Sequence, residues 1–242
     1  MNLDDRWSSY WESVRKAMQL DNYDHAEPLL YAALDIAEDF PPDDKRLVMT
    51  LECLAEVLFK LGHPTQSEPV VKRIIMIYER KHGADHPDIA VFINNLALLY
   101  HSQKKHFMAE TEYQKALSIQ TKLLGNTHPQ TLNVMANYAR LLTETHREPE
   151  AKHLIACIKG AQTGYWKQSG TYKAYVAEPQ EAVSTAPVED ITLQDIALVP
   201  VITGKIEGSE ALAPLDQLKG SRPQASPSSM MQRLVEQRKQ VE

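Results

Sequence analysis

The chain has little cysteine, no long apolar run and no surplus of positive charge, and each absence excludes a class of protein. Its 242 residues hold two cysteines, Cys53 and Cys157, which we expect to be reduced thiols. No run of about 18 apolar residues exists, so no membrane-spanning helix is expected. The N-terminus, Met-Asn-Leu-Asp-Asp-Arg-Trp, carries acids where a secretory signal peptide needs bases. We therefore expect a soluble, cytoplasmic protein.

Charge balance argues against a nucleic-acid partner. Lys and Arg number 26 against 32 Asp and Glu, which gives a formal net charge of −6. A protein that tracks a phosphate backbone needs a basic surplus on at least one face. The sequence therefore predicts neither nucleic-acid binding nor insertion into a membrane.

Motifs that carry common catalytic chemistry are also missing. The sequence contains no Gly-rich phosphate loop, no nucleophile elbow and no Cys–His pairing. His82 and His86 have the i, i+4 spacing of a zinc protease, but Gly83 and Pro87 predict a loop between them. No acid follows them in the pattern that such an enzyme uses. The sequence predicts no enzyme, no metal site and no cofactor.

What the chain does have is a period, because chemically alike residues recur every 42 residues. Two series of small residues recur every 42 residues, except that the first step of each series is 41 residues. They are Ala26, Ser67, Ala109 and Ala151, and Val14, Ala55, Ala97 and Ala139. Two larger apolar series follow the same offset: Leu54, Leu96 and Tyr138, and Leu58, Tyr100 and Leu142. The dipeptide His86-Pro87 returns as His128-Pro129. A stacking unit must present the same packing surface to each neighbour, so these series indicate a repeat protein.

Each unit is predicted to contain two amphipathic helices. Residues 89–101 and 107–123 both place apolar side chains at i, i+3, i+4 and i+7. Small residues such as Ala97 and Ala109 would let two antiparallel helices approach closely. Gly62 and Gly125 are expected to end helices.

Prolines mark other helix boundaries. The Pro after each linker His is expected to start a helix, with the His ring packed beside it. Pro28 and Pro69 lie near the starts of second helices. Either those helices begin late or each gives up one backbone hydrogen bond.

This pattern resembles the tetratricopeptide repeat. The 42-residue period, Asn94-Asn95-Leu96-Ala97-Leu98-Leu99-Tyr100 and the His-Pro linkers are similar to the kinesin-light-chain subtype. The resemblance covers residues 46–159 well and 7–45 more loosely. It implies an all-α fold, a right-handed superhelical solenoid of about four helix pairs over residues 1–160. The repeats are expected at 7–44, 45–87, 88–129 and 130–160, with the helices of the first at 7–20 and about 24–39.

Beyond residue 160 no fifth repeat follows. The aromatic segment 161–177, with Tyr165, Trp166, Tyr172 and Tyr175, is predicted to fold back and cap the last helix. Residues 178–242 are rich in Pro, Gly, Ser and Gln, which predicts a tail of low order. Within it, 191–202 is strand-like and 228–241 has the pattern of a short amphipathic helix. Either this order is incidental, or one segment docks on a partner or on the chain's own concave face.

The resemblance implies that first helices line a concave face, and that the residue before each Leu-Ala pair points into it. That position holds Glu12, Cys53, Asn95 and Asn137. Asparagine suits a peptide groove because its amide both donates and accepts. We expect the peptide-binding residues to be Asn94, Asn95, Leu98, His101, Asn133, Asn137, Arg140, Glu56 and Lys60. The alternatives are that Asn95 and Asn137 only tie neighbouring helices together, and that Cys53 is an inert buried thiol.

Function is predicted from these features as non-catalytic protein–protein interaction. The chain would bind a peptide or protein segment in its groove, as an adaptor or assembly scaffold. One alternative is a partner-regulated sensor whose C-terminal tail docks in its own groove, and another is a non-catalytic subunit of an enzyme complex. A carboxylate clamp for chaperone tails is excluded. Such a clamp requires Lys, Arg and Asn at defined groove positions, and only Asn95 fits these positions. Kinesin light chain itself is not expected, since residues 1–45 lack a heptad coiled coil.

Overall fold

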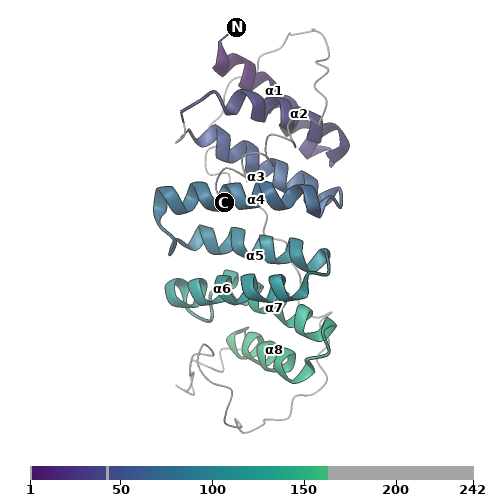
Figure 1. Ribbon diagram of the computed structural model, residues 1–242, viewed down its shortest axis with the longest axis vertical. Coiled ribbons are helices and arrows are strands. Elements are labelled where there is room, and N and C mark those ends of the chain that lie inside the picture. Colours follow the sequence, from purple (N-terminus) through teal and green to yellow (C-terminus); the bar gives the residue numbers. More distant parts are fainter. Residues whose placement is uncertain (1, 42–43, 163–242) are drawn as a thin grey trace. The chain divides into compact units, whose positions relative to one another are not determined.

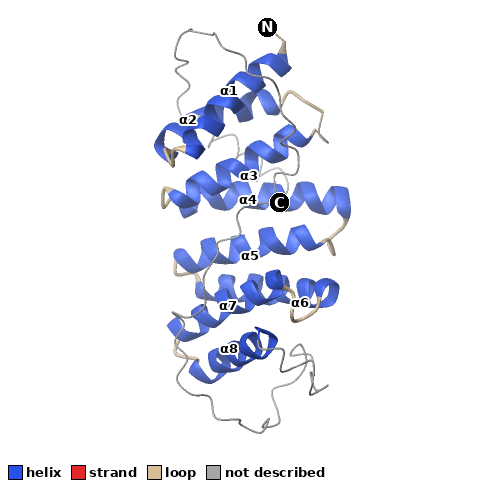
Figure 2. Ribbon diagram, turned by 180° about the vertical axis from the view of Figure 1, so that it is seen from behind, coloured by secondary structure: helices blue, strands red, loops and turns tan. Residues whose placement is uncertain are grey.

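The structure, a computed structural model, describes residues 2–41 and 44–162, and this part of the chain is entirely helical apart from its loops (Figures 1 and 2). The helices are α1 (Leu3–Gln19), α2 (Tyr23–Ala37), α3 (Lys45–Lys60), α4 (Pro64–His82), α5 (Pro87–Ser102), α6 (His106–Leu124), α7 (Pro129–Glu144) and α8 (Glu148–Gln162). They form four helix pairs of the tetratricopeptide type. This confirms the predicted all-α fold. No helix within these residues is long and apolar enough to cross a membrane.

The described helices fall into two compact units, divided after Lys81. In the first unit, α1 packs on α2 and α2 packs on α3. The pair α3 and α4 is joined where Ser67 Oγ donates to the carbonyl oxygen of Ala55 at 3.2 Å. Each helix of this unit therefore contacts the one that follows it.

The second unit contains α5 to α8. Successive helices pack on each other here too, and in addition α5 contacts α7. The first helices of two successive repeats are thus neighbours. This contact positions the polar side chains of the candidate site.

The two small-residue series mark the helix crossings, as predicted. Every member is at most 3% exposed, in both units: Ala26, Ser67, Ala109 and Ala151, and Val14, Ala55, Ala97 and Ala139. The Ser67–Ala55 hydrogen bond shows directly how close two such positions come. Side chains this small let the helix backbones approach, and larger neighbours then fill the space around them.

The turn inside each helix pair is the same structure four times. A residue with φ between 51° and 73° follows the C-cap of each first helix: Asp21, Gly62, Lys104 and His146. The next residue donates its N–H to a carbonyl five residues back, at 2.8–2.9 Å: Asn22 to Ala17, His63 to Leu58, Lys105 to Tyr100 and Arg147 to Leu142. This is the Schellman motif, in which glycine is the usual left-handed residue. Gly62 was therefore recognisable from the sequence, whereas the three non-glycine residues were not.

The structure corrects the predicted start of the first helix and decides between the two alternatives for Pro28 and Pro69. Helix α1 begins at Leu3 and not at Trp7, because Asn2 Oδ1 accepts from the Asp5 N–H at 2.7 Å and caps the helix. Pro28 and Pro69 lie inside α2 and α4. Of the two alternatives for these prolines, the second holds: the helices start early and each gives up one backbone bond.

The linker histidines are N-caps, a role that the sequence did not predict, whereas the predicted packing of their rings beside Pro stays a prediction. His86 Nδ1 accepts from the Asp88 N–H, and His128 Nδ1 accepts from the Gln130 N–H, both at 3.3 Å. Pro87 and Pro129 then occupy the first positions of α5 and α7. An imidazole nitrogen thus accepts the capping hydrogen bond that is usually accepted by a side-chain oxygen of Ser, Thr, Asp or Asn.

The predictions for the C-terminal part concern residues outside the described ranges. One prediction is the aromatic segment 161–177, which lies outside the described ranges from residue 163 onward and contains Tyr165, Trp166, Tyr172 and Tyr175. The other is the tail 178–242 with its segments 191–202 and 228–241. They stay predictions.

Candidate functional site

A cluster of asparagines lies where α5 meets α7. Asn137 Nδ2 donates to Asn94 Oδ1 at 3.2 Å and to Asn133 Oδ1 at 3.1 Å. Asn94 and Asn137 are 2% and 3% exposed, so their bond is shielded from water. Removing the donor would leave buried carbonyl oxygens unpaired, which costs more than the bond itself contributes. Asn137 therefore does tie two first helices together, as one of the sequence alternatives predicted.

Asn95 behaves differently from its neighbour Asn94. It is also buried, at 5% exposure. Its Oδ1 is shut off from solvent and has no hydrogen-bond partner among the residues that the structure describes. A buried acceptor without a donor costs about 1–3 kcal/mol. Because the Asn95 amide oxygen is shut off from solvent, a group outside the described chain could bond to it only if the side chains around it moved.

Arg140 brings a positive charge to the same helix as Asn137. Its side chain is half-buried, and it forms no ion pair within residues 2–41 and 44–162. The charge lies close enough to His101 to help lower the pKa of that imidazole. A half-buried guanidinium without a carboxylate favours an anionic partner. Leu98, also half-buried, adds an apolar contact one turn beyond Asn95 on α5.

His101 and Glu144 form a second polar link between α5 and α7. His101 Nε2 lies 3.1 Å from Glu144 Oε2, and Lys104 Nζ lies 3.2 Å from the same oxygen. Burial lowers the pKa of His101, while the Glu144 carboxylate opposes that shift. Burial alone would raise the pKa of Glu144, but His101 and Lys104 outweigh it and the pKa is lowered.

The other two predicted site residues lie in the first unit, on α3. Glu56 is half-buried, and burial raises the pKa of its carboxyl although Lys60, which is exposed, partly opposes the shift. Cys53 lies nearby, and burial, with Glu56 and Glu52, raises the pKa of its thiol to about 12. A thiol with so high a pKa carries almost no thiolate at neutral pH and is unreactive. The raised pKa supports the alternative that Cys53 is an inert thiol, and its side chain is half-buried.

Seven of the nine predicted residues belong to the second unit and lie on α5 and α7: Asn94, Asn95, Leu98, His101, Asn133, Asn137 and Arg140. We call this set the α5–α7 surface, although only Leu98, Asn133 and Arg140 are partly exposed and the other four residues are buried beneath them. Glu144 belongs beside it and was missed by sequence reasoning. It could have been found, since Glu144 follows His101 by the same 43 residues that separate Asn137 from Asn94.

Histidines of the described chain contact single acids or a single cysteine, as His101 contacts Glu144 and His153 contacts Cys157. His82 and His86 have ring centroids 4.6 Å apart. Among residues 2–41 and 44–162, however, no group of three or more His, Cys, Asp or Glu side chains is arranged to hold a metal ion. The described site is thus made of amides, one guanidinium and one imidazole–carboxylate pair.

Comparison with known proteins agrees with the repeat geometry. A family model described as tetratricopeptide repeat matches residues 88–156, and a second model of the same description matches residues 47–88. The search of curated proteins returned no match.

Solved structures with detectable similarity are distant. One is a variant of a candidate kinesin light chain from Podosopora anserina with nearly identical TPR-like repeats, at 16% identity and a TM-score of 0.43, covering 69% of this chain and 100% of that one. Another is BtubC (BKLC) from P. vanneervenii, at 15% identity and a TM-score of 0.42, covering 77% of this chain and 100% of that one. A further structure of the Podosopora anserina protein has 16% identity and a TM-score of 0.40, covering 68% and 97%.

The family assignment draws on the two sequence models, the 42-residue period and the repeated helix pairs. The models together run from residue 47 to residue 156, which includes most of α3, all of α4 to α7 and part of α8. The small-residue series and the four identical turns extend the same unit through α1 and α2. Residues 47–156 are therefore tetratricopeptide repeats, and the same helix-pair unit continues through α1 and α2.

Proposed function

We propose that this chain is a non-catalytic interaction module that binds a peptide or protein segment along the α5–α7 surface and acts as an adaptor or assembly scaffold. Tetratricopeptide repeats generally mediate protein–protein interaction or scaffolding. The observation that carries the proposal is the half-buried guanidinium of Arg140, which forms no ion pair within the described residues. It lies on α7, which contacts α5, the helix that bears Leu98 and Asn95.

The chemistry of these side chains indicates what kind of segment would bind. Once the side chains that cover it move, the Asn95 oxygen can accept a backbone N–H from an extended segment of any sequence. Arg140 presents a fork of N–H donors that matches a carboxylate. The preferred ligand is therefore an extended segment with an acidic side chain that reaches Arg140.

In the first unit, Glu56 and Lys60 are proposed to contribute a contact of the opposite charge. The pKa of Glu56 is raised by burial, so its carboxylate is incompletely compensated by Lys60. A Lys or Arg side chain from a ligand would supply the missing positive charge. It is proposed as a separate contact of the first unit, independent of the α5–α7 surface.

A double variant tests the surface without breaking its structural bonds. Asn95→Ala with Arg140→Ala leaves the Asn137–Asn94 and Asn137–Asn133 hydrogen bonds in place. Peptides would be selected from a displayed random library against the full chain and their affinities measured by fluorescence polarisation. We expect the double variant to bind them at least about tenfold more weakly, since a lost charged hydrogen bond alone accounts for about 1.5–3 kcal/mol.

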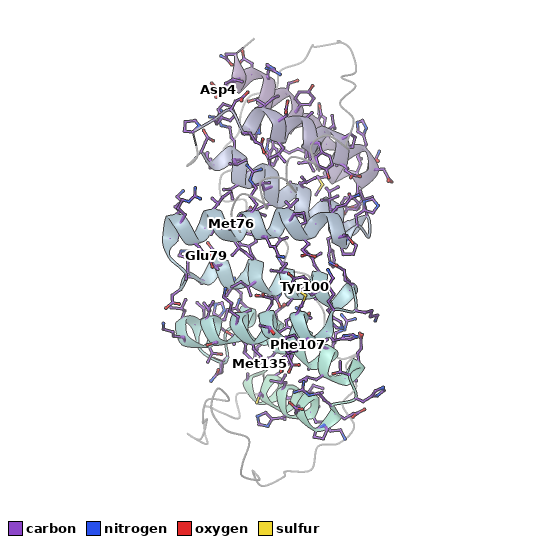
Figure 3. All side chains as sticks on the ribbon, in the orientation of Figure 1. Asp4, Met76, Glu79, Tyr100, Phe107 and Met135 are labelled. Atoms are coloured by element: carbon purple, nitrogen blue, oxygen red, sulfur yellow. The ribbon has the colours of Figure 1, made fainter. Side chains whose placement is uncertain are left out.

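Phe107 provides the matched control, because it is 83% exposed on α6 and offers a competing apolar surface (Figure 3). Phe107→Ala is expected to leave the affinities unchanged. Circular dichroism would confirm that all variants keep their helix content. Unchanged affinity in the double variant, or a loss confined to Phe107→Ala, would contradict the proposed function.

A further inference from the structure

Leu98 and Arg140 occupy the same position in successive repeats, because Arg140 follows Leu98 by the 42-residue period. Leu98 lies on α5 and Arg140 on α7, and these two helices contact each other. Both side chains are partly exposed, and Arg140 forms no ion pair within residues 2–41 and 44–162. The α5–α7 surface therefore offers an apolar side chain and a cation at matching positions of two neighbouring helices.

We propose that the chain's own segment 189–202 occupies this surface. The segment lies outside the described ranges. Its Asp195 forms an ion pair with Arg140, and its Leu193 supplies the apolar contact to α5. The inference rests on the proposed function, because it names a segment that binds the same surface. A segment from a partner would then have to displace residues 189–202, so the chain would regulate its own binding.

Charge directs this part of the chain to the second unit. Residues 174–204 contain no Lys or Arg, and their five acids are Glu178, Glu181, Glu189, Asp190 and Asp195. Residues 2–81 hold 10 Lys and Arg against 15 Asp and Glu, a difference of −5. Residues 82–162 hold 8 against 7, a difference of +1. An acidic segment is repelled by the first unit and not by the second, which also carries the unpaired Arg140.

The spacing within the segment matches the two surface residues. In an extended chain every second side chain points to the same side, so Leu193 and Asp195 share a side. They are about 7 Å apart along an extended chain, while the axes of packed helices lie about 8–10 Å apart. The long side chain of Arg140 spans the difference. A segment that crosses α5 and α7 thus places its leucine over one helix and its carboxylate over the next.

The segment can reach the surface from the end of the described chain. Helix α8 packs on α7, and its 15 residues are about 22 Å long. Residues 163–194 span up to roughly 100 Å when fully extended, which is more than enough to return to α7. Such a tether gives the segment an effective concentration on the order of millimolar. One exposed ion pair and one apolar contact, with a Kd of the same order, would keep the surface occupied about half of the time.

Photo-crosslinking within the full chain tests the proposal without any added peptide. A benzophenone side chain replaces Leu98 and keeps an apolar group at that position. Trypsin then releases the acidic stretch as a single peptide, residues 174–205, because it cuts after Lys173 and Lys205. We expect position 98 to be linked to this peptide within one chain, and no such link from a benzophenone at the exposed Ser118 of α6. No adduct from position 98, or an adduct that joins two chains, would overturn the proposal.

Substitution of Asp195 tests the ion pair. Asp195→Asn should lower the yield of the position-98 adduct about threefold, because loss of an exposed ion pair weakens docking by up to about fivefold. Glu181→Gln is the matched control, since it removes an acid from the same tryptic peptide but outside the segment. It should leave the yield unchanged. Equal yields from the two variants would overturn the pairing of Asp195 with Arg140.

A benzophenone at position 193 probes the contact from the other side and leaves α5 and α7 unaltered. It should attach to the tryptic peptides 82–104 and 123–140, which contain α5 and most of α7. If the chain with a benzophenone at position 98 does not fold, this result decides the question. Attachment only to the α6 peptides 106–115 and 116–122 would overturn the proposal. The proposed function is judged separately, because it requires a library-selected peptide to attach to position 98 whether or not residues 189–202 do.

Discussion

Ala109→Leu is expected to destabilise the second unit by about 1–3 kcal/mol, because the larger side chain must displace a helix at a crossing that is already packed. Ala109 is fully buried and is the counterpart of Ser67, whose hydroxyl donates to a backbone carbonyl of the other helix of its pair. A larger side chain at such a close approach is accommodated only if a helix moves. Urea unfolding followed by circular dichroism gives the change in midpoint.

The repeat itself supplies the control for this substitution. Ser67 occupies the equivalent position in α4 and donates to Ala55, whose counterpart in α5 is Ala97. Ala109→Ser should therefore be tolerated, with its hydroxyl donating to the carbonyl of Ala97. If the Leu and Ser variants unfolded at the same urea concentration, the crossing would not be where the period places it.

Tyr113→Ala is expected to have the largest effect of any single change considered, about 3–5 kcal/mol, because it empties the space of a fully buried aromatic ring. Tyr113 stacks on Tyr138 with ring centroids 6.0 Å apart. Removing it would leave a cavity between α6 and α7 that the rest of the helix pair cannot fill. The loss would be read from the urea midpoint of the full chain.

Phenylalanine substitutions separate the ring from its hydroxyl. Tyr113→Phe should be neutral or stabilising, since this hydroxyl is buried without a partner in the described residues. Tyr138→Phe should cost about 1.5–3 kcal/mol, because the Tyr138 hydroxyl donates to Glu110 at 2.8 Å and accepts from Gln114 at 3.1 Å. Equal costs for the two Phe variants would show that the Tyr113 hydroxyl has a partner.

The packing of the repeats could be read from the sequence because burial and period are directly coupled. A residue at a helix crossing must be small in every repeat. The positions of Ala97 and Ala109 could therefore be identified because small residues recur there at the repeat period. The turns are less visible. Lys104 and His146 take the left-handed conformation that Gly62 takes, at a modest cost in strain, and no composition signal marks them.

For the candidate site, the sequence predicted which helix face its residues occupy but not which hydrogen bonds they form. The period identifies Asn94 and Asn95 as adjacent residues near one face, but it does not say which of them bonds another helix. In the structure Asn94 accepts from Asn137, while Asn95 keeps an unpaired oxygen. That difference depends on where α7 lies relative to α5, which is a tertiary contact and not a property of either helix.

The capping histidines show the same limit. His86 was assigned to its repeat position correctly, but its role was inferred from the neighbouring Pro87. The structure shows that its Nδ1 atom also accepts the Asp88 N–H. Such a bond depends on the side-chain rotamer, about which a single sequence says nothing.

The central claim, that a partner segment lies along the α5–α7 surface, is tested most directly by site-specific photo-crosslinking. A benzophenone side chain would replace Leu98, half-buried on α5, or Ser118, exposed on α6, and each chain would be irradiated with a library-selected peptide. The account predicts a covalent adduct from position 98 and none from position 118. An adduct from position 118 with none from position 98 would contradict it.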